Sequence, residues 1–190
     1  MARIAGVKSL HIIPITNSSA TSTDIATYGT LEELTQFISF SGSLSRAESA
    51  WYSNNKTEES FSSITGAELE AVVGKLSPSQ KAKLSGATYA SGVMTRRSTD
   101  RQAEFGVLVV YELMGAGGGQ YAELYCRTKL AIDTIEGETK TDSVTDSPVT
   151  ISGIAAPLPG GQVVVSFEDT GSTLKTPAQL FAEMKKISLA

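Results

Sequence analysis

The sequence has very few of the residues that build disulfides, metal centres and catalytic triads: one cysteine, Cys126, and one histidine, His11, in 190 residues. A single cysteine forms no disulfide within the chain, so the fold needs no oxidising compartment. Zinc sites usually draw on several His and Cys side chains, so we expect no zinc. His11 lies beside an apolar stretch and far from any strained serine motif, so we expect a packed or surface histidine. We predict no catalytic residue, no cofactor, no metal and no enzymatic activity.

Long apolar runs and an excess of basic residues are also missing. No segment approaches the roughly 18 apolar residues that a membrane span needs, and the first residues carry no small-residue cleavage site. The formal net charge is -4 and the sequence pI is about 5.1, which gives no general attraction to nucleic acid or to an anionic membrane. We therefore expect a soluble protein that does not grip DNA.

What the chain does have is the composition of an ordinary globular protein, with 41% hydrophobic and 19% charged residues. A chain of this size buries a sizeable core as one domain, with or without a small appendage. Turn and strand patterns extend to about residue 170, and a helical pattern follows. We therefore predict a β domain over residues 1–170 and a C-terminal helical extension over residues 171–190.

The strongest local signal is an antiparallel hairpin from Phe105 to Ile132, hinged at a cluster of four glycines. One face of its first arm carries Phe105, Val107, Val109 and Tyr111, and the other carries Leu108 and Val110. A strand that is apolar on both faces needs cover on both. At a sheet edge it would also expose unpaired backbone groups, so we expect either the chain's own fold or neighbouring copies to cap it.

Other segments also have strand patterns, and a chain rich in short strands and turns indicates a mainly β, antiparallel sandwich or barrel. The segments are Leu10–Ile13, Gln36–Leu44, Thr57–Ile64, Ala67–Val73, Ser147–Ile154 and Gln162–Phe167. Pro14 has no N–H to donate and is expected where the first strand ends, at an edge or bulge. From Ile38 to Leu44, apolar residues and glycine alternate with serines, which predicts one buried and one polar face. Ala67–Val73 fits a strand best, with a short helix as the alternative.

Two helices are expected, one short and flanking and one at the C-terminus. Ser77, Pro78 and Gln80 form a capping signature, and Gly86 marks the end of that helix. Thr176 and Gln179 repeat the signature, and an amphipathic pattern follows it. The apolar stripe of this second helix is Leu180, Phe181, Met184 and Ile187, with Lys185 and Lys186 in the last turn. This stripe docks either on the parent sheet or on a neighbouring copy.

Several polar segments between these elements have two interpretations each. The loop expected over Ser45–Asn55 holds the only tryptophan, Trp51, next to Tyr52: either the pair packs on its own domain or it anchors another subunit.

Three arginines between Tyr89 and Gln102 indicate a solvated surface, with phosphate contact as the weaker alternative. The acidic stretch from Asp133 to Asp146 indicates solvation, with calcium binding as a weak rival because the loop spacing is missing. The run Gly115–Gly119 lacks the ending of a phosphate loop and is read as a turn.

Three short motifs, in order, resemble the major tail protein family of long-tailed bacteriophages, in the phi13-type group. They are Gly6-Val7-Lys8-Ser9-Leu10, Lys83-Leu84-Ser85-Gly86 and the segment Ser147-Pro148-Val149-Thr150-Ile151-Ser152-Gly153. The likeness covers Gly6 to about Phe167 and is specific by the order of its motifs. Ser85 stands where that family often has an apolar residue, and the segment Thr176–Ala190 lies outside the likeness.

The resemblance implies a tail-tube β-sandwich with a flanking helix, whose copies form hexameric rings stacked into a hollow tube that delivers the genome. It implies a virion protein of the tail, assembled in the host cytoplasm, with tape measure and terminator proteins as partners and no membrane partner. Double-stranded DNA would pass through without specific binding, because each basic residue on the wall would add salt-sensitive grip. We therefore expect an acidic or neutral lumen.

The resemblance and the edge argument together assign candidate contact residues. Closing strands of six copies into one barrel removes exposed edges through a ring-closing contact. The expected contacts within a ring are Phe105, Val107, Val109, Tyr111, Tyr121 and Tyr125, and those between rings are Ser45, Arg46, Trp51, Tyr52, Asn54 and Asn55. Glu112 and Glu123 are the expected lumen residues. The alternative function is a β-sandwich carbohydrate-binding, receptor-binding or capsid decoration protein that uses Trp51 and Tyr52 as a stacking platform.

Overall fold

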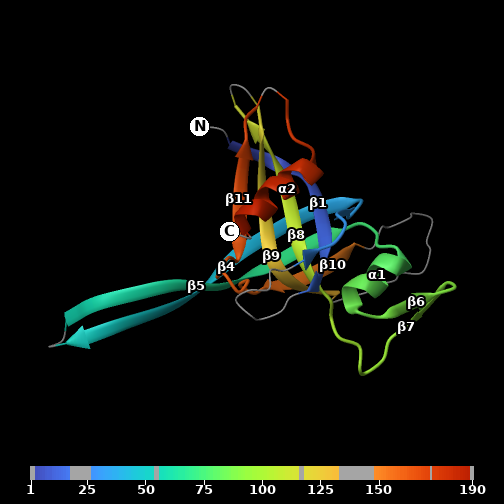
Figure 1. Ribbon diagram of the computed structural model, residues 1–190, viewed down its shortest axis with the longest axis horizontal. Coiled ribbons are helices and arrows are strands. Elements are labelled where there is room, and N and C mark those ends of the chain that lie inside the picture. The colour runs from blue at the N-terminus through green and yellow to red at the C-terminus, as the bar shows by residue number, and fades with distance from the viewer. Residues whose placement is uncertain are drawn as a thin grey trace, which may run out of the picture.

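The structure is a computed structural model that describes residues 3–17, 27–53, 56–115, 118–132, 148–171 and 173–188. Side chains are described for these residues except 17, 27, 49–53, 56–61 and 187–188. The elements follow one another as β1 (Arg3–Asn17), β2 (Thr27–Tyr28), β3 (Glu32–Glu33), β4 (Phe37–Ser53), β5 (Lys56–Val73), α1 (Pro78–Ser85), β6 (Thr88–Ala90), β7 (Val93–Thr95), β8 (Glu104–Met114), β9 (Gln120–Ile132), β10 (Val149–Ala155), β11 (Val164–Asp169) and α2 (Pro177–Ser188). The fold is mainly β and antiparallel, as the sequence predicts (Figure 1).

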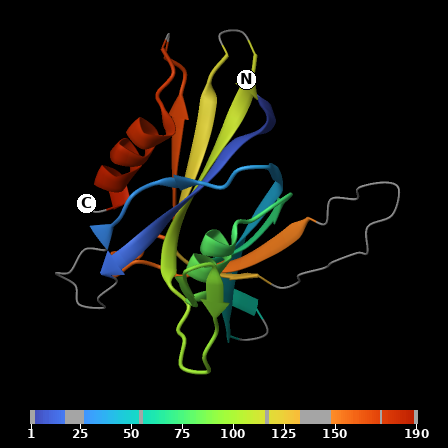
Figure 2. The ribbon, with the colours of Figure 1, turned by 90° about the vertical axis from the view of Figure 1, so that its right-hand side faces the viewer.

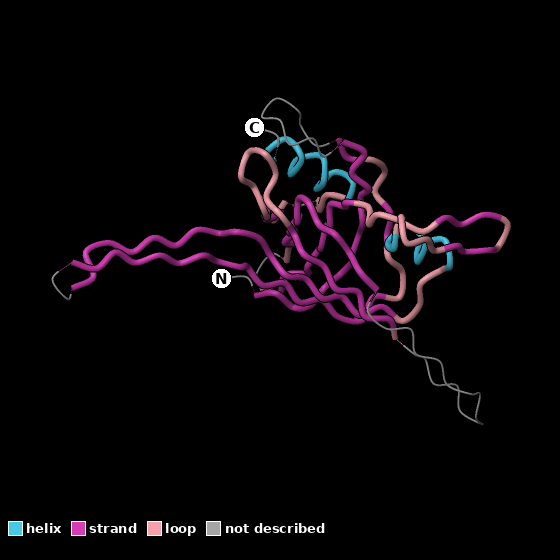
Figure 3. Tube along the Cα trace, turned by 90° about the horizontal axis from the view of Figure 1, so that it is seen from below, coloured by secondary structure: helices cyan, strands magenta, loops and turns pink. Residues whose placement is uncertain are grey.

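The main sheet runs in the order β2-β1-β8-β9-β10-β5-β4, and it branches at β9. The first half of β9 pairs with β11, from Gln120 opposite Asp169 to Tyr125 opposite Val164. The second half pairs with β10, where Ile132 lies opposite Ile151. The branch lets β10, β5 and β4 fold across one face of β1 and β8, which produces a sandwich. Figures 2 and 3 show the crossing strands and the two helices at the periphery.

Two apolar clusters pack on opposite faces of the central strands. Phe105, Val107 and Val109 of β8 face the cluster between the two layers, with the inward residues of β5 and β10. Leu108 and Val110 face the second cluster, which α2 covers. This arrangement confirms the sequence prediction that the first arm of the glycine hairpin is covered on both faces. Both covers come from the same chain.

The position of the hairpin in the sheet differs from one alternative weighed above, because it does not lie at an edge. Among the described residues, β8 lies between β1 and β9, and β9 pairs with β8, β10 and β11. Its backbone groups therefore need no neighbouring copy. The described edges of the sheet are elsewhere, on the short β2 and β3 and on the longer β4 and β11.

The first strand is longer than its apolar segment. β1 continues through Pro14, which pairs with Phe105 of β8, and ends at Asn17. The carbonyl of Pro14 accepts a hydrogen bond from the backbone N–H of Gly29 at 2.8 Å, which keeps the strand in register with the chain that returns beside it. The missing N–H of Pro14 thus does not end the strand.

Both predicted helices are present with their caps. Ser77 and Gln80 of α1 form the full capping box, and Gly86 ends the helix in the left-handed region at φ 71°. Thr176 and Gln179 make the corresponding contacts before α2. Leu180 and Met184 are fully buried against the parent sheet, so α2 belongs to the same packed unit as the strands.

Candidate assembly surfaces

A long two-stranded ribbon projects from the sandwich, and we call it the arm: residues Ser45–Ser53 of β4 and Lys56–Ile64 of β5. Its ladder runs from Ser45 opposite Gly66 to Ser53 opposite Lys56. Figures 1 and 3 show it extending well beyond the body on one side. The arm side chains that the structure describes, those of residues 45–48 and 62–64, belong to neither apolar cluster. This described part of the arm therefore adds nothing to the core of the body.

The arm corrects the loop predicted over Ser45–Asn55. Ser45, Arg46, Trp51 and Tyr52 lie on β4, where Trp51 pairs with Glu59 and Tyr52 with Thr57. The segment is rich in serine and has no apolar alternation, so its sequence does not indicate a strand. It forms one because hydrogen bonds to the partner strand pair its backbone groups whatever the side chains are. Asn54 and Asn55 and the side chains of Trp51 and Tyr52 lie outside what the structure describes. The acidic stretch from Asp133 also lies outside it.

Among the described strands with one unpaired edge, the short β2, β3, β6 and β7 each pair with a single neighbour, and the two longer ones are β4 and β11. β4 pairs only with β5, and β11 pairs only with β9. Each therefore presents a row of backbone N–H and C=O groups to which another strand can add. β4 is 17 residues long, which makes its edge a long one for a body of this size.

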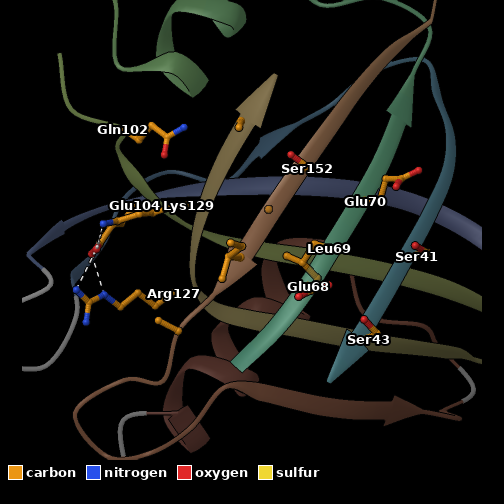
Figure 4. Close-up of a pocket in the computed structure, with 14 residues that line it drawn as sticks. Ser41, Ser43, Glu68, Leu69, Glu70, Gln102, Glu104, Arg127, Lys129 and Ser152 are labelled. Atoms are coloured by element: carbon orange, nitrogen blue, oxygen red, sulfur yellow. Dashed lines mark hydrogen bonds and ion pairs between the residues drawn. The ribbon is translucent and has the colours of Figure 1, made fainter. Parts of the chain in front are cut away.

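The outer face of β4, β5 and β10 is a polar surface that we call the serine–glutamate face: Ser41, Ser43, Glu68, Glu70 and Ser152. Cross-strand pairing aligns Ser41, Glu70 and Ser152 in one row. The face lines an open hollow of about 660 Å³. Figure 4 shows both glutamates on β5 between the serines of its two neighbours. The sequence shows that Glu68 and Glu70 alternate with apolar residues, but it does not show which strands lie on either side of β5.

An ion-pair cluster closes one side of this hollow. The guanidinium of Arg127 donates two hydrogen bonds of 2.9 Å to the carboxylate of Glu104, and Lys129 lies 3.8 Å from the same group (Figure 4). The bidentate geometry raises the pKa of Arg127 further above its ordinary value through the hydrogen bond to Glu104. These basic residues are thus partly neutralised, and the hollow keeps its two glutamates without a cation among the described residues.

Glu123 lies in a cluster of tyrosines on β8 and β9, which we call the carboxylate pocket: Glu123, Tyr111, Tyr121 and Tyr125. The three hydroxyls donate hydrogen bonds to its carboxylate at 3.3, 3.1 and 3.0 Å respectively. Burial, and then the charge of Glu123, raise the pKa of Tyr111 and of Tyr125. The phenols therefore stay protonated and remain donors.

The carboxylate pocket opens at the root of the arm. A hollow of about 590 Å³ lies there between β4 and β5 on one side and β9 and β11 on the other. Leu44 and Ile64 at its rim are 44% and 48% exposed. In the sequence pattern Leu44 belongs to a buried row, but the two layers of the sandwich have already separated at this position. Ile38, in the same predicted row, is exposed because a bulge between Phe37 and Ser39 shifts the register.

The residues predicted to contact a neighbour within a ring are placed mainly inside the chain. Phe105, Val107, Val109 and Tyr125 are at most 4% exposed and lie in the core. They are buried because their strands are central in the sheet, so Phe105, Val107 and Val109 offer no surface to another copy, and Tyr125 reaches only the wall of the hollow at the carboxylate pocket. Tyr111, Tyr121 and Glu123 meet in the carboxylate pocket, and Glu112 is exposed on β8.

A second, smaller hairpin lies at the opposite end of the body from the arm (Figure 1). It is formed by β6 and β7, within the segment predicted as a connector, and its register pairs Tyr89 with Met94. The loop that follows carries Arg96, Arg97 and Arg101, which are exposed and form no ion pair with a described residue. We call Arg96–Arg101 the arginine loop. The expectation of a solvated basic surface fits this exposure.

The described part of the chain contains neither a metal-binding cluster nor a helix that could span a membrane. No group of three or more His, Cys, Asp or Glu side chains there is arranged to hold a metal ion. None of the described helices has the length and apolar character required to cross a bilayer.

Comparison with known proteins adds no identification. No protein-family model matches this chain, and no curated protein matches it significantly.

Proposed function

We propose that this chain is the subunit of a hollow tube, the major tail protein of a long-tailed bacteriophage, assembled from stacked hexameric rings. The observation that carries the proposal is the arm, a paired ribbon that leaves the body (Figure 1) and whose described side chains lie outside both apolar clusters. A ribbon of this length costs conformational entropy to order, and burial against another copy would offset that cost. The order of the sequence motifs supports the same role.

The free edges support ring closure in this proposal. β4 at one edge and β11 at the other are different surfaces of the same subunit, so a contact between them is heterologous. A heterologous contact closes into a ring when the rotation from one copy to the next is a whole fraction of a full turn. Pairing β4 of one copy with β11 of the next would extend the sheet around that ring and cover both of these edges. This pair of edges replaces the central hairpin as the proposed contact within the ring.

The serine–glutamate face supports a conduit for DNA. Its short hydroxyl side chains and two carboxylates offer no cation to phosphate, and Arg127 and Lys129 at the side of the hollow are paired with Glu104, so contact with DNA would release few counterions. In this proposal the face lines the lumen, a role that sequence analysis gave to Glu112 and Glu123. The tube would be a non-enzymatic part of the virion, built in the host cytoplasm, with tape measure and terminator proteins at its ends. Duplex DNA would pass through without specific binding, and no membrane partner is proposed.

Electron microscopy of the purified protein tests the proposal. Concentrated wild-type protein is expected to form rings or tubes in negative stain. A variant that lacks residues 47–62, closed by a two-residue turn, is expected to keep its melting temperature and to form no tubes. Trp51→Ala tests the anchor more finely, since it should leave the subunit folded and impair tube growth.

The outcome that contradicts the proposal is equally concrete. Normal tubes from the shortened variant would remove the arm from assembly. Strictly monomeric wild-type protein at high concentration, with measurable affinity for a glycan, would favour the alternative of a carbohydrate-binding or receptor-binding module.

A further inference from the structure

We infer that the carboxylate pocket receives an arginine side chain from the arginine loop of a second copy of this chain, stacked head to tail. This inference rests on the proposed function, because the contact would join one ring to the next. It assigns a partner to two charged surfaces that have none among the residues that the structure describes.

The pocket has the chemistry of a guanidinium receptor. Within the described residues, no Lys, Arg or His side chain lies at ion-pair distance from Glu123. Its carboxylate accepts hydrogen bonds from three phenols and keeps further acceptor sites for a planar, forked donor. The surrounding rings add cation–π attraction, and partial burial reduces screening by salt.

The arginine loop has the complementary chemistry. Between Lys75 and Arg101 the sequence has six basic residues and a single acidic one, Asp100, in a chain whose net charge is -4. The carboxylate of Asp100 accepts a hydrogen bond from the backbone N–H of Arg97 at 2.7 Å, so it shapes the loop. None of the three guanidinium groups forms an ion pair with a described residue.

The two surfaces lie at opposite ends of the body, with the arm extending beyond the pocket (Figure 1). The pocket opens at the root of the arm, and the loop follows β7 at the other end of the long axis (Figure 1). Copies stacked along this axis would bring the pocket of one against the loop of the next, and the same contact would repeat. A phosphate would satisfy the arginines alone and a free cation would satisfy the pocket alone. A second copy satisfies both.

Charge-neutralising variants of the full-length protein test the contact. Glu123→Gln keeps the shape and an acceptor for the tyrosines, and the triple variant R96Q/R97Q/R101Q changes only exposed side chains. Each is expected to raise the concentration at which half of the protein sediments as polymer by at least about tenfold. The reason is that each variant removes one partner of a partly buried charge pair and leaves the other charge unpaired. Glu183→Gln on α2 is the matched control and should sediment as wild type.

Cross-linking locates the contact directly. Arg97→Cys mixed with Ile64→Cys, which changes the rim of the pocket, should give a disulfide-linked dimer under mild oxidation, whereas Arg97→Cys mixed with Met114→Cys should not. The native Cys126 is fully buried, and burial raises the pKa of its thiol to about 12, so it does not form a disulfide under these conditions.

The outcomes separate the two proposals. If wild type forms tubes, the charge variants polymerise as wild type and the cross-link is absent, then the inference fails and the tube stands. If wild type forms no polymer, the proposed function fails and the inference fails with it. Circular dichroism checks the fold of each variant, and the exposed arginine variant decides the matter if Glu123→Gln misfolds.

Discussion

Tyr125 is the side chain on which the two layers of the sandwich converge. Its ring packs against Phe40 of β4 with centroids 5.7 Å apart, and its hydroxyl donates to Glu123. Gly42 lies directly against that hydroxyl, and a Cβ at Gly42 would collide with it. The strand alternation places Gly42 in the inward row correctly. The reason for a glycine there is visible only once Tyr125 is known to cross beneath β4.

His11 is expected to make stability depend on pH. Its ring is 4% exposed, Nε2 contacts the hydroxyl of Ser9 at 3.0 Å, and Nδ1 has no hydrogen-bond partner among the described residues. Burial lowers its pKa below the ordinary value of 6.5, while the charge of Glu33 opposes this shift. The unfolded chain therefore binds the proton more readily, and stability falls as the pH drops from above 6.5 toward the folded-state pKa.

Urea unfolding of wild type and His11→Asn at several pH values measures this effect. The variant should lose the slope near neutral pH, whatever its overall stability. Asp169 does not confuse the result, because hydrogen bonds led by the backbone N–H of Lys175 lower its pKa below 3.8, and its contribution is lost only at more acidic pH. An unchanged slope in the variant would show that His11 does not control it.

At the scale of elements, the sequence predicts what local chemistry determines. The caps at Ser77 and Thr176 fix both helix starts, and Leu69 and Ala71 alternate with glutamates as β5 requires. The prediction of a strand over Thr57–Ile64 is confirmed by β5, whereas the β4 half of the arm is predicted as a loop because its register comes from pairing with β5 and not from an apolar pattern. The carboxylate pocket was missed as a site because β8 and β9 bring its members together only across strands.

α2 is an element whose packing predicts a large effect on stability. Leu180 is fully buried, and the neighbouring Phe181 meets Tyr28 edge to face with centroids 5.4 Å apart. Leu180→Ala is expected to lower the free energy of unfolding by about 2–5 kcal/mol, because it leaves a cavity between the helix and the sheet. Chemical denaturation measures this loss.

The matched control for this prediction lies on the same helix. Lys186 is exposed and pairs with Glu183 at 3.2 Å, so Lys186→Ala should change stability by less than about 0.5 kcal/mol. Equal effects of the two substitutions would mean that α2 does not dock as described.

At the scale of the whole molecule, the assembled object should change its behaviour toward DNA when the serine–glutamate face is recharged. The double variant E68K/E70K is expected to form tubes that retain duplex DNA at low salt and release it as salt rises, because lysines replace condensed counterions. Wild-type tubes should not retain DNA at moderate salt. A filter-binding assay across a salt series measures both.

The control for this experiment recharges a different surface. Glu183→Lys on α2 adds positive charge outside the serine–glutamate face and should not cause retention. If both lysine variants retained DNA equally, general charge and not the lining of the conduit would explain the effect. If E68K/E70K tubes retained none, the face would not lie along the path of the genome.

The pairing of β1 with β8 has a consequence for the order in which the chain acquires its structure. Leu10 lies opposite Val109, so this ladder joins the start of the chain to a strand that is synthesised much later. Closing so long a loop costs entropy, whereas β8 and β9 meet across a short turn. We expect the glycine hairpin to gain amide protection first in pulse-labelled hydrogen exchange and β1 to gain it last. A ribosome-bound chain that still lacks β8 can pair its first strand only with the two-residue β2 and β3, and its maturation waits for the second half of translation.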